Sequence, residues 1–170
     1  MRNFITYEDI SRLARPCTTE PELAEAMIAE AQRVELKPRL GDALYVAVGE
    51  DDKNGRFRTL LDGGQWKDRC GETRLLTGLR TALAYYALAR IIRDGNIMPS
   101  TYGAVIKDDQ YSVEAEKAER QRQYRELFAH ADSYMAEVLQ YLSHNRGIFP
   151  EYKACSKASN NRFVIKTIGK

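Results

Sequence analysis

The side chains that could perform chemistry are few and widely separated. The three cysteines, Cys17, Cys70 and Cys155, form no Cys-x-x-Cys pair, which argues against a disulfide framework and a cysteine-based zinc site. His130 and His144 lie on one predicted helix, about 21 Å apart by the helical rise, so they cannot share a metal ion within one chain. The sequence therefore predicts no metal site.

Cys70 has polar neighbours, but they disfavour a nucleophile. Asp68 and Glu72 flank it, and negative charge opposes formation of the thiolate, which is the reactive form. The acidic pairs at 51–52 and 108–109 lie in turn-like sequences, where aspartate is favoured for backbone reasons. Because no nucleophile, base and orienting group converge, we predict no catalytic residues, no cofactor and no enzymatic activity.

The stretch LLDGGQWKDRCGETRLLTGL, residues 60–79, raises the question of a phosphate-binding loop. Its Gly-Gly pair is not followed by Gly-Lys-Ser/Thr, and no GxGxxG follows a strand, so the known phosphate motifs are absent. Residues 65–70 alternate, Gly71-Glu72 predicts a turn, and residues 73–76 return, which is typical of a β-hairpin. A lone hairpin is marginally stable, so we expect it to pack on a helix or pair with another subunit.

Helices are predicted on both sides of this hairpin. Thr6 can cap a short first helix, and Thr19 can cap a second one, with Pro21 near its first position and Glu22 completing a capping box. A break at 37–38 is expected to separate this second helix from a third that carries apolar residues from Leu40 to Val48.

The central and final helices are expected to form most of the core. The central helix is predicted from Thr77 to Arg93 and is apolar around much of its circumference, as a helix inside a bundle is. A loop over 96–111 and a long helix over 112–145 follow, and this helix packs through its C-terminal half. The side chains expected to be buried between these two helices are Leu83, Tyr86, Leu127, Phe128, Met135 and Val138.

Composition and charge are those of a globular protein with a basic tail. The 170 residues fit about one domain, and the net charge is only +2. Five basic residues and one acid follow Gly147, whereas the remainder carries 21 basic and 23 acidic residues. No signal peptide is visible at the N-terminus, and the longest apolar run is broken by Arg90, well short of the ~20 residues that span a bilayer. We expect no membrane association and a cytoplasmic site of synthesis and assembly.

Together these patterns predict a mainly α fold. It is a small helical bundle of about four to five helices, with a short β-hairpin inserted before the central helix. Residues 1–150 form the helical domain, and residues 151–170 form a basic, flexible C-terminal tail. Within that tail, residues 163–168 are rich in β-branched side chains and are predicted to add as a strand to a sheet edge on assembly.

Several motifs in this order resemble a known family. They are FITYEDI near the N-terminus, KPRLGDALY, LLDGGQW with a following Cys-Gly, GLRTALAYYALARII, a YG…DDQYS segment, and YLSHN with FPEYK. Over roughly residues 1–152 the chain resembles the head–tail connector proteins of tailed bacteriophages, also called adaptor or head-completion proteins, in the variant of Bacteroidetes phages and prophages. That family has no catalytic residues to carry over.

The resemblance implies a structural virion protein. The subunit would form a ring with itself, commonly twelvefold, in the neck between head and tail. The ring would bind the portal protein, extend the channel through which genomic DNA passes, and dock a tail or stopper protein. The residues predicted to contact partners lie in the hairpin, the 96–111 loop and the tail: Gln65, Trp66, Lys67, Tyr102, Val105, Tyr111, Phe163 and Ile165.

Two other functions remain open from the sequence. A nucleic-acid-binding regulator could use the basic tail, although no helix-turn-helix with a basic recognition helix is present and the body is near neutral. A small enzyme is the other possibility, but the sequence shows no group of polar residues that would form an active site. Salt-dependent affinity for duplex DNA would favour the regulator, and a tightly bound metal or cofactor would favour the enzyme.

Overall fold

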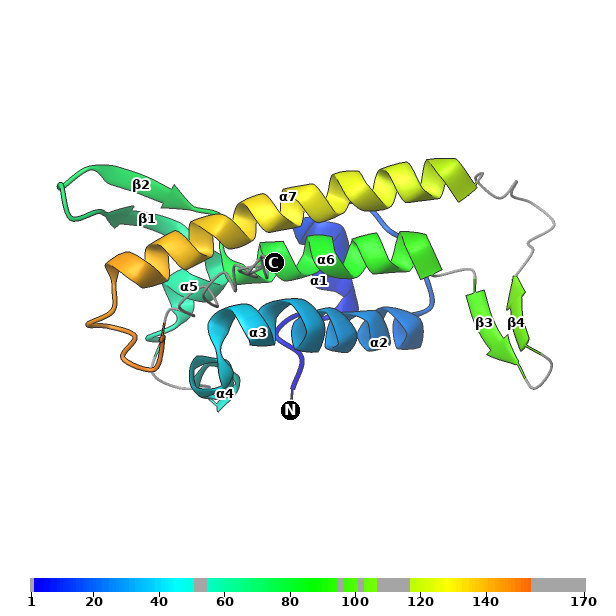
Figure 1. The fold of residues 1–170 in the computed structure, drawn as a ribbon, viewed down its shortest axis with the longest axis horizontal. Helices are drawn as coiled ribbons and strands as arrows, with labels where there is room; N and C mark the ends of the chain where they lie inside the picture. Colours follow the sequence, from blue (N-terminus) through cyan, green and yellow to red (C-terminus); the bar gives the residue numbers. More distant parts are fainter. Residues whose placement is uncertain (1, 51–54, 95–96, 101–102, 107–116, 154–170) are drawn as a thin grey trace, which may run out of the picture.

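The chain folds into a helical bundle with two small hairpins (Figure 1). The computed structural model describes residues 2–50, 55–94, 97–100, 103–106 and 117–153. Its elements are, in chain order, α1 Tyr7–Leu13, α2 Pro21–Ala31, η1 Gln32–Leu36, α3 Lys37–Leu40, α4 Asp42–Glu50, α5 Arg58–Asp62, β1 Gly64–Lys67, β2 Thr73–Leu76, α6 Leu79–Asp94, β3 Ile97–Ser100, β4 Gly103–Ile106 and α7 Lys117–His144. The prediction of a mainly α bundle with a hairpin before the central helix is confirmed.

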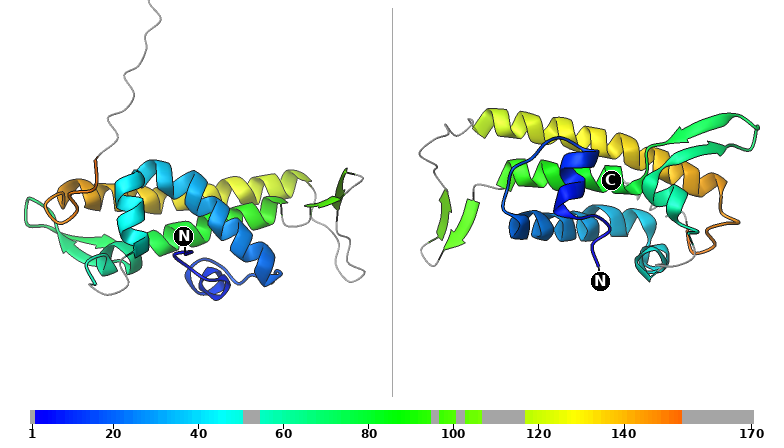
Figure 2. Two further views of the ribbon diagram at one scale, coloured as in Figure 1. Left: turned by 90° about the horizontal axis from the view of Figure 1, so that it is seen from below. Right: turned by 180° about the vertical axis from the view of Figure 1, so that it is seen from behind.

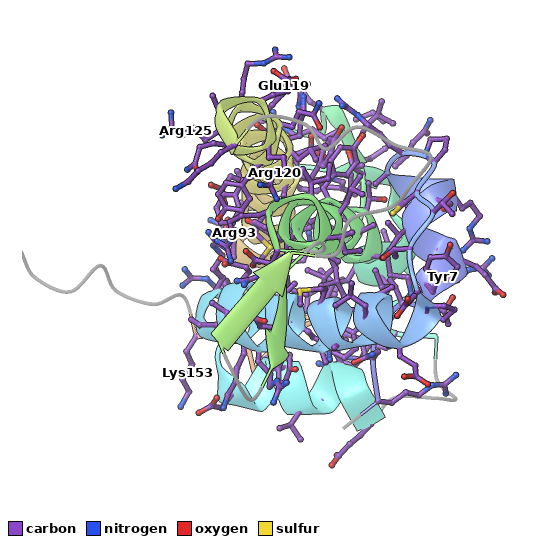
Figure 3. All side chains as sticks on the ribbon, turned by 90° about the vertical axis from the view of Figure 1, so that its right-hand side faces the viewer. Tyr7, Arg93, Glu119, Arg120, Arg125 and Lys153 are labelled. Carbon is purple, nitrogen blue, oxygen red and sulfur yellow. The ribbon has the colours of Figure 1, made fainter. Side chains whose placement is uncertain are left out.

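The central helix α6 is enclosed by the other helices. Seen along its axis, α6 lies between α7, α1 and α2 (Figure 3). Its packing against α7 is the most extensive in the molecule, followed by its packing against α2. Its buried residues point to all sides, as was predicted from the apolar residues around much of this helix.

Most of the predicted core is confirmed. Leu83, Tyr86 and Leu127 are fully buried, and Met135 and Val138 are buried with them. Phe128 is only half-buried, at the edge of the cluster, where its ring meets that of Tyr86 with 5.0 Å between centroids. The buried residues of α7 begin at Leu127, so this helix packs through its C-terminal half, as expected.

The helix that begins at Pro21 does not break at Lys37-Pro38. It continues from α2 through η1, a π-helical turn, into α3, so the predicted break is wrong. Proline has no N–H and its ring crowds the carbonyl four residues earlier, and a wider turn before Pro38 accommodates both effects. The chain turns instead at Gly41, whose positive φ of 79° suits glycine.

The helix starts agree with prediction at one site and differ at another. At α1, Thr6 forms the predicted cap, with the Asp9 side chain completing a capping box. At α2, Pro21 occupies the first turn as predicted, but the N-cap is Glu20, so the capping box predicted for Thr19 and Glu22 is not formed.

The two hairpins lie at opposite ends of the bundle, as all three ribbon views agree (Figures 1 and 2). β1 and β2 pair antiparallel, with Gly64 opposite Leu76 and Lys67 opposite Thr73. β3 and β4 also pair antiparallel, within the segment that was predicted to be a loop. That prediction was wrong because Gly and Pro in NIMPSTYGAVI were taken as signs of irregular structure, whereas here they lie in a second hairpin.

No helix in the described residues is long and apolar enough to cross a membrane.

Candidate interaction surface

The root of the β1–β2 hairpin is a close crossing of two backbone segments. Gly63 and Gly78 have φ values of 84° and 102°, in the region that favours glycine. A Cβ on Gly63 would lie 2.4 Å from the carbonyl oxygen of Leu76, and one on Gly78 would lie 2.6 Å from the amide nitrogen of Gly63. The Gly-Gly pair and the Thr-Gly that follows are therefore architectural.

One face of the hairpin is built into the bundle. Trp66 is only 9% exposed and lies against α7, with its ring 5.3 Å from those of both Tyr141 and His144. At the hairpin exit, the backbone N–H and hydroxyl of Thr77 both donate to Oε2 of Glu137 on α7, at 3.0 and 2.8 Å. These contacts fix the hairpin to α7.

The tip of the hairpin is held by a single carboxylate. Oδ1 of Asp68 accepts the backbone N–H groups of Cys70 and Glu72, and Oδ2 accepts Nε of Arg74 at 2.7 Å. The bond from Arg74, followed by the two backbone bonds, lowers the pKa of Asp68 below its ordinary value. Gly71 completes the turn with a φ of 82°. The backbone of the turn is thus held by hydrogen bonds within the hairpin itself.

The opposite face of the hairpin is not covered by the described residues of the subunit. The pairing places Gln65 opposite Leu75 and Lys67 opposite Thr73, and paired residues point to the same side of a two-stranded sheet. All four are exposed, and Leu75 at 73% is the most exposed of the large apolar side chains in the described residues. We call Gln65, Lys67, Thr73 and Leu75 the outer hairpin face.

The structure divides the predicted contact residues of the hairpin. Gln65 and Lys67 lie on the outer hairpin face, where a partner could reach them. Trp66 lies on the opposite side and packs into its own subunit, because neighbouring residues of a strand alternate between faces, so it offers no free surface and its assignment as a contact is corrected. The residues of this face that the sequence reasoning missed are Thr73 and Leu75, which lie opposite Lys67 and Gln65 in the returning strand. The alternation of the returning strand was the signal that could have identified them.

The other predicted contact residues are not placed by the structure. Val105 belongs to β4, of which the backbone is described. Tyr102, Tyr111, Phe163 and Ile165 lie outside the described residues, as does the tail from residue 154. The described chain ends at Lys153, and Tyr152 still belongs to the core, two residues beyond the predicted domain boundary.

The titratable groups of the described chain do not converge on a reactive centre. Cys70 is exposed at the hairpin tip, and partial burial raises the pKa of the Cys17 thiol, which disfavours the thiolate. The ring of His144 packs against that of Trp66 at an angle of 60°, while His130 lies on the α7 surface, 3.9 Å from Glu126. Within the described ranges, no three His, Cys, Asp or Glu side chains are grouped as a metal site would need.

A buried arginine ties the central helix to the π-helical turn. Arg90 is 6% exposed and donates through its two terminal nitrogens to Glu30 and, at 2.9 Å, to Glu35. The π-helical turn carries Glu35, whose other oxygen accepts Arg39 at 3.0 Å. The sequence hinted at this arrangement only by placing Arg90 inside an otherwise apolar run.

The same network continues to α7. Arg39 donates to Asp132 at 2.9 Å, and the hydroxyl of Tyr86 donates to the same carboxylate oxygen. Burial and this hydrogen bond raise the pKa of Tyr86 far above its ordinary value, so the hydroxyl stays protonated as a donor. Every charge named here has a partner inside the subunit, which marks the network as structural.

Comparison with known proteins gives a family but no function. Residues 36–162, about three quarters of the chain, match the family of unknown function DUF6712. The chain belongs to this family. The matched region contains the hairpin, the central helix and the long helix. No curated protein and no solved structure matches the chain.

Proposed function

We propose that this member of the DUF6712 family is a head–tail connector subunit of a tailed bacteriophage. It forms a ring, twelvefold as is common in the class it resembles, beside the portal protein in the neck of the virion. The ring extends the DNA channel and docks a tail or stopper protein, and genomic DNA passes through without sequence-specific binding. The motif order of the sequence is the source of this proposal.

The outer hairpin face is the observation that supports it most. The hairpin is anchored by a two-glycine crossing and a buried tryptophan, yet its outer face is left exposed by the described residues of the subunit. A large apolar side chain such as Leu75, exposed to water on an ordered strand, is unfavourable and indicates a surface that a protein partner covers. A subunit designed for assembly needs such a surface on a stable core.

The chemistry of the described residues agrees with a structural role. Asp68 at the hairpin tip and the two terminal nitrogens of Arg90 in the bundle are hydrogen-bonded to neighbours in the same chain. A regulator that binds nucleic acid is the competing proposal. It depends on the basic residues of the tail, which lie outside the described part of the chain.

Electron microscopy of particles tests the proposal. In the phage or prophage that encodes this chain, purified virions should contain it as a ring next to the portal. Deleting the gene should give DNA-filled heads that leak DNA or fail to join tails. The same deletion complemented by the unaltered chain is the control.

Two results would count against a connector. Infectious particles that lack the protein would contradict it directly. Salt-dependent binding of the purified chain to duplex DNA, lost when residues 154–170 are removed, would support the regulator instead.

A further inference from the structure

We infer that the outer hairpin face of one subunit binds the exposed face of α4 on the next subunit. The partner is thus a second copy of this chain, joined head to tail. The inference rests on the proposed ring, and it names the two surfaces that would close it.

The hairpin contributes an apolar centre beside positive charge. Leu75 is 73% exposed, and Lys67 lies on the same face. Within the described chain, neither Lys67 nor Arg69 at the tip forms an ion pair, because Asp68 is already bound by Arg74. The outer hairpin face therefore presents Leu75 and Lys67, with Arg69 at the adjoining tip, and the described residues supply neither cation with an ion-pair partner.

The α4 helix offers the complementary pattern. Asp42, Val46 and Glu50 follow one another at intervals of four, so they form one stripe of the helix, and all three are exposed. Val46 is 44% exposed, between the two carboxylates, and α4 contains no basic residue. Nζ of Lys37 lies 3.4 Å from Asp42 and offsets its charge, so the Glu50 end of the stripe is the more negative.

The two surfaces match in chemistry and lie apart on the molecule. Pairing Leu75 with Val46 would cover two of the four large apolar side chains that are exposed in the described residues, and Lys67 could face Glu50. Opposite charges around an apolar centre fix the register of a contact. Figure 1 places α4 on the opposite side of the bundle from α7 and the hairpin. A contact between two different surfaces is heterologous, and repeated around an axis it builds a ring.

Disulfide trapping tests this pairing directly. The three native cysteines are replaced by serine, and Leu75→Cys and Val46→Cys are introduced into separate chains, which are mixed at about 1 mM, where even weak contacts are populated. Oxidation should join the two kinds of chain into dimers, and a chain with both substitutions should form a ladder of higher oligomers. Leu75→Cys alone and Leu75→Cys mixed with Val34→Cys should stay monomeric.

Charge reversal gives a second measurement in the native chain. Lys67→Glu and Glu50→Lys should each weaken self-association at least tenfold by sedimentation, and the double variant should recover most of it. The inference is overturned if the oxidised mixture stays monomeric, if Leu75→Cys links to itself, or if the double variant does not recover. Virions with a ring but no 75–46 link would refute this contact alone, whereas virions without the chain would refute the connector.

Discussion

The central helix α6 and the β1–β2 hairpin use their side chains in opposite ways. Residues of α6 are buried on all sides, and even Arg90 finds two carboxylates inside the subunit. The hairpin buries Trp66 and Leu76 on one face and leaves Leu75 in solvent on the other. The helix packs on all sides within one chain, whereas one face of the hairpin is left uncovered by the part of the chain that the structure describes.

This difference separates the positions that determine folding from those available for assembly. Changes in α6, at the glycine crossing and at the buried hairpin residues Trp66 and Leu76 should lower the free energy of unfolding. Changes on the outer hairpin face should leave it unaltered. The predictions below test this division, beginning with the largest expected loss of stability.

Leu83→Ala should have the largest effect. Leu83 is fully buried, and truncation of such a residue leaves a cavity that costs about 2–5 kcal/mol of unfolding free energy. Equilibrium denaturation measures it, with Leu75→Ala as the matched control on the outer hairpin face. That exposed change should stay within about 0.5 kcal/mol. Equal losses of unfolding free energy in Leu83→Ala and Leu75→Ala would contradict the distinction between the core and the outer hairpin face.

Gly63→Ala should cost less, about 1–3 kcal/mol, and should loosen the hairpin root. The new Cβ would combine an unfavourable positive φ with a clash against the backbone of β2. Gly71→Ala is the control, because Gly71 has a similar φ of 82° but no atom within 4 Å of the added carbon. Gly63→Ala should therefore be the more destabilising of the two, by thermal denaturation. Equal melting temperatures would show that the crossing is not tight.

Acidification should give the smallest effect, confined to the hairpin tip. Folding lowers the pKa of Asp68 below its ordinary value of 3.8, chiefly through the bond from Arg74. The stabilisation is fully present above that ordinary value and is lost as the pH falls through the lowered pKa. The carboxyl signal of Asp68 in NMR should thus titrate below pH 3.8, and Arg74→Gln should move it back toward that value. An unshifted titration in the native chain would contradict the hydrogen-bonded tip.

The sequence predicted those features that depend on local pattern. The apolar circumference of α6, the burial of Leu83 and the hairpin with its turn at Gly71 follow from periodicity and glycine placement. The π-helical turn before Pro38 did not follow, because the sequence rule for proline predicts a break and not a widened helix. The second hairpin, β3–β4, was not predicted, because its Pro and Gly residues are more typical of loops than of strands.

The candidate surface was predicted only in part. Alternation placed Trp66 correctly in a strand, but which side of that strand faces the bundle depends on how α7 crosses it. The contacts of Trp66 with Tyr141 and His144, more than seventy residues later in the chain, determine which side faces the bundle. With Trp66 on the buried side, Leu75 lies on the outer face. Contacts between residues far apart in the chain leave no pattern in a single sequence from which the buried side of a strand could be predicted.

The most direct test of the account compares folding and assembly in one variant, Leu75→Asp. Its free energy of unfolding should match that of the unaltered chain within about 0.5 kcal/mol, because Leu75 is exposed. Its incorporation into phage particles should be lost, while Val34→Asp, at an exposed valine in the π-helical turn η1, should be incorporated normally. A Leu75→Asp chain that assembles into infectious particles, or one that fails to fold, would contradict the claim that the outer hairpin face serves assembly.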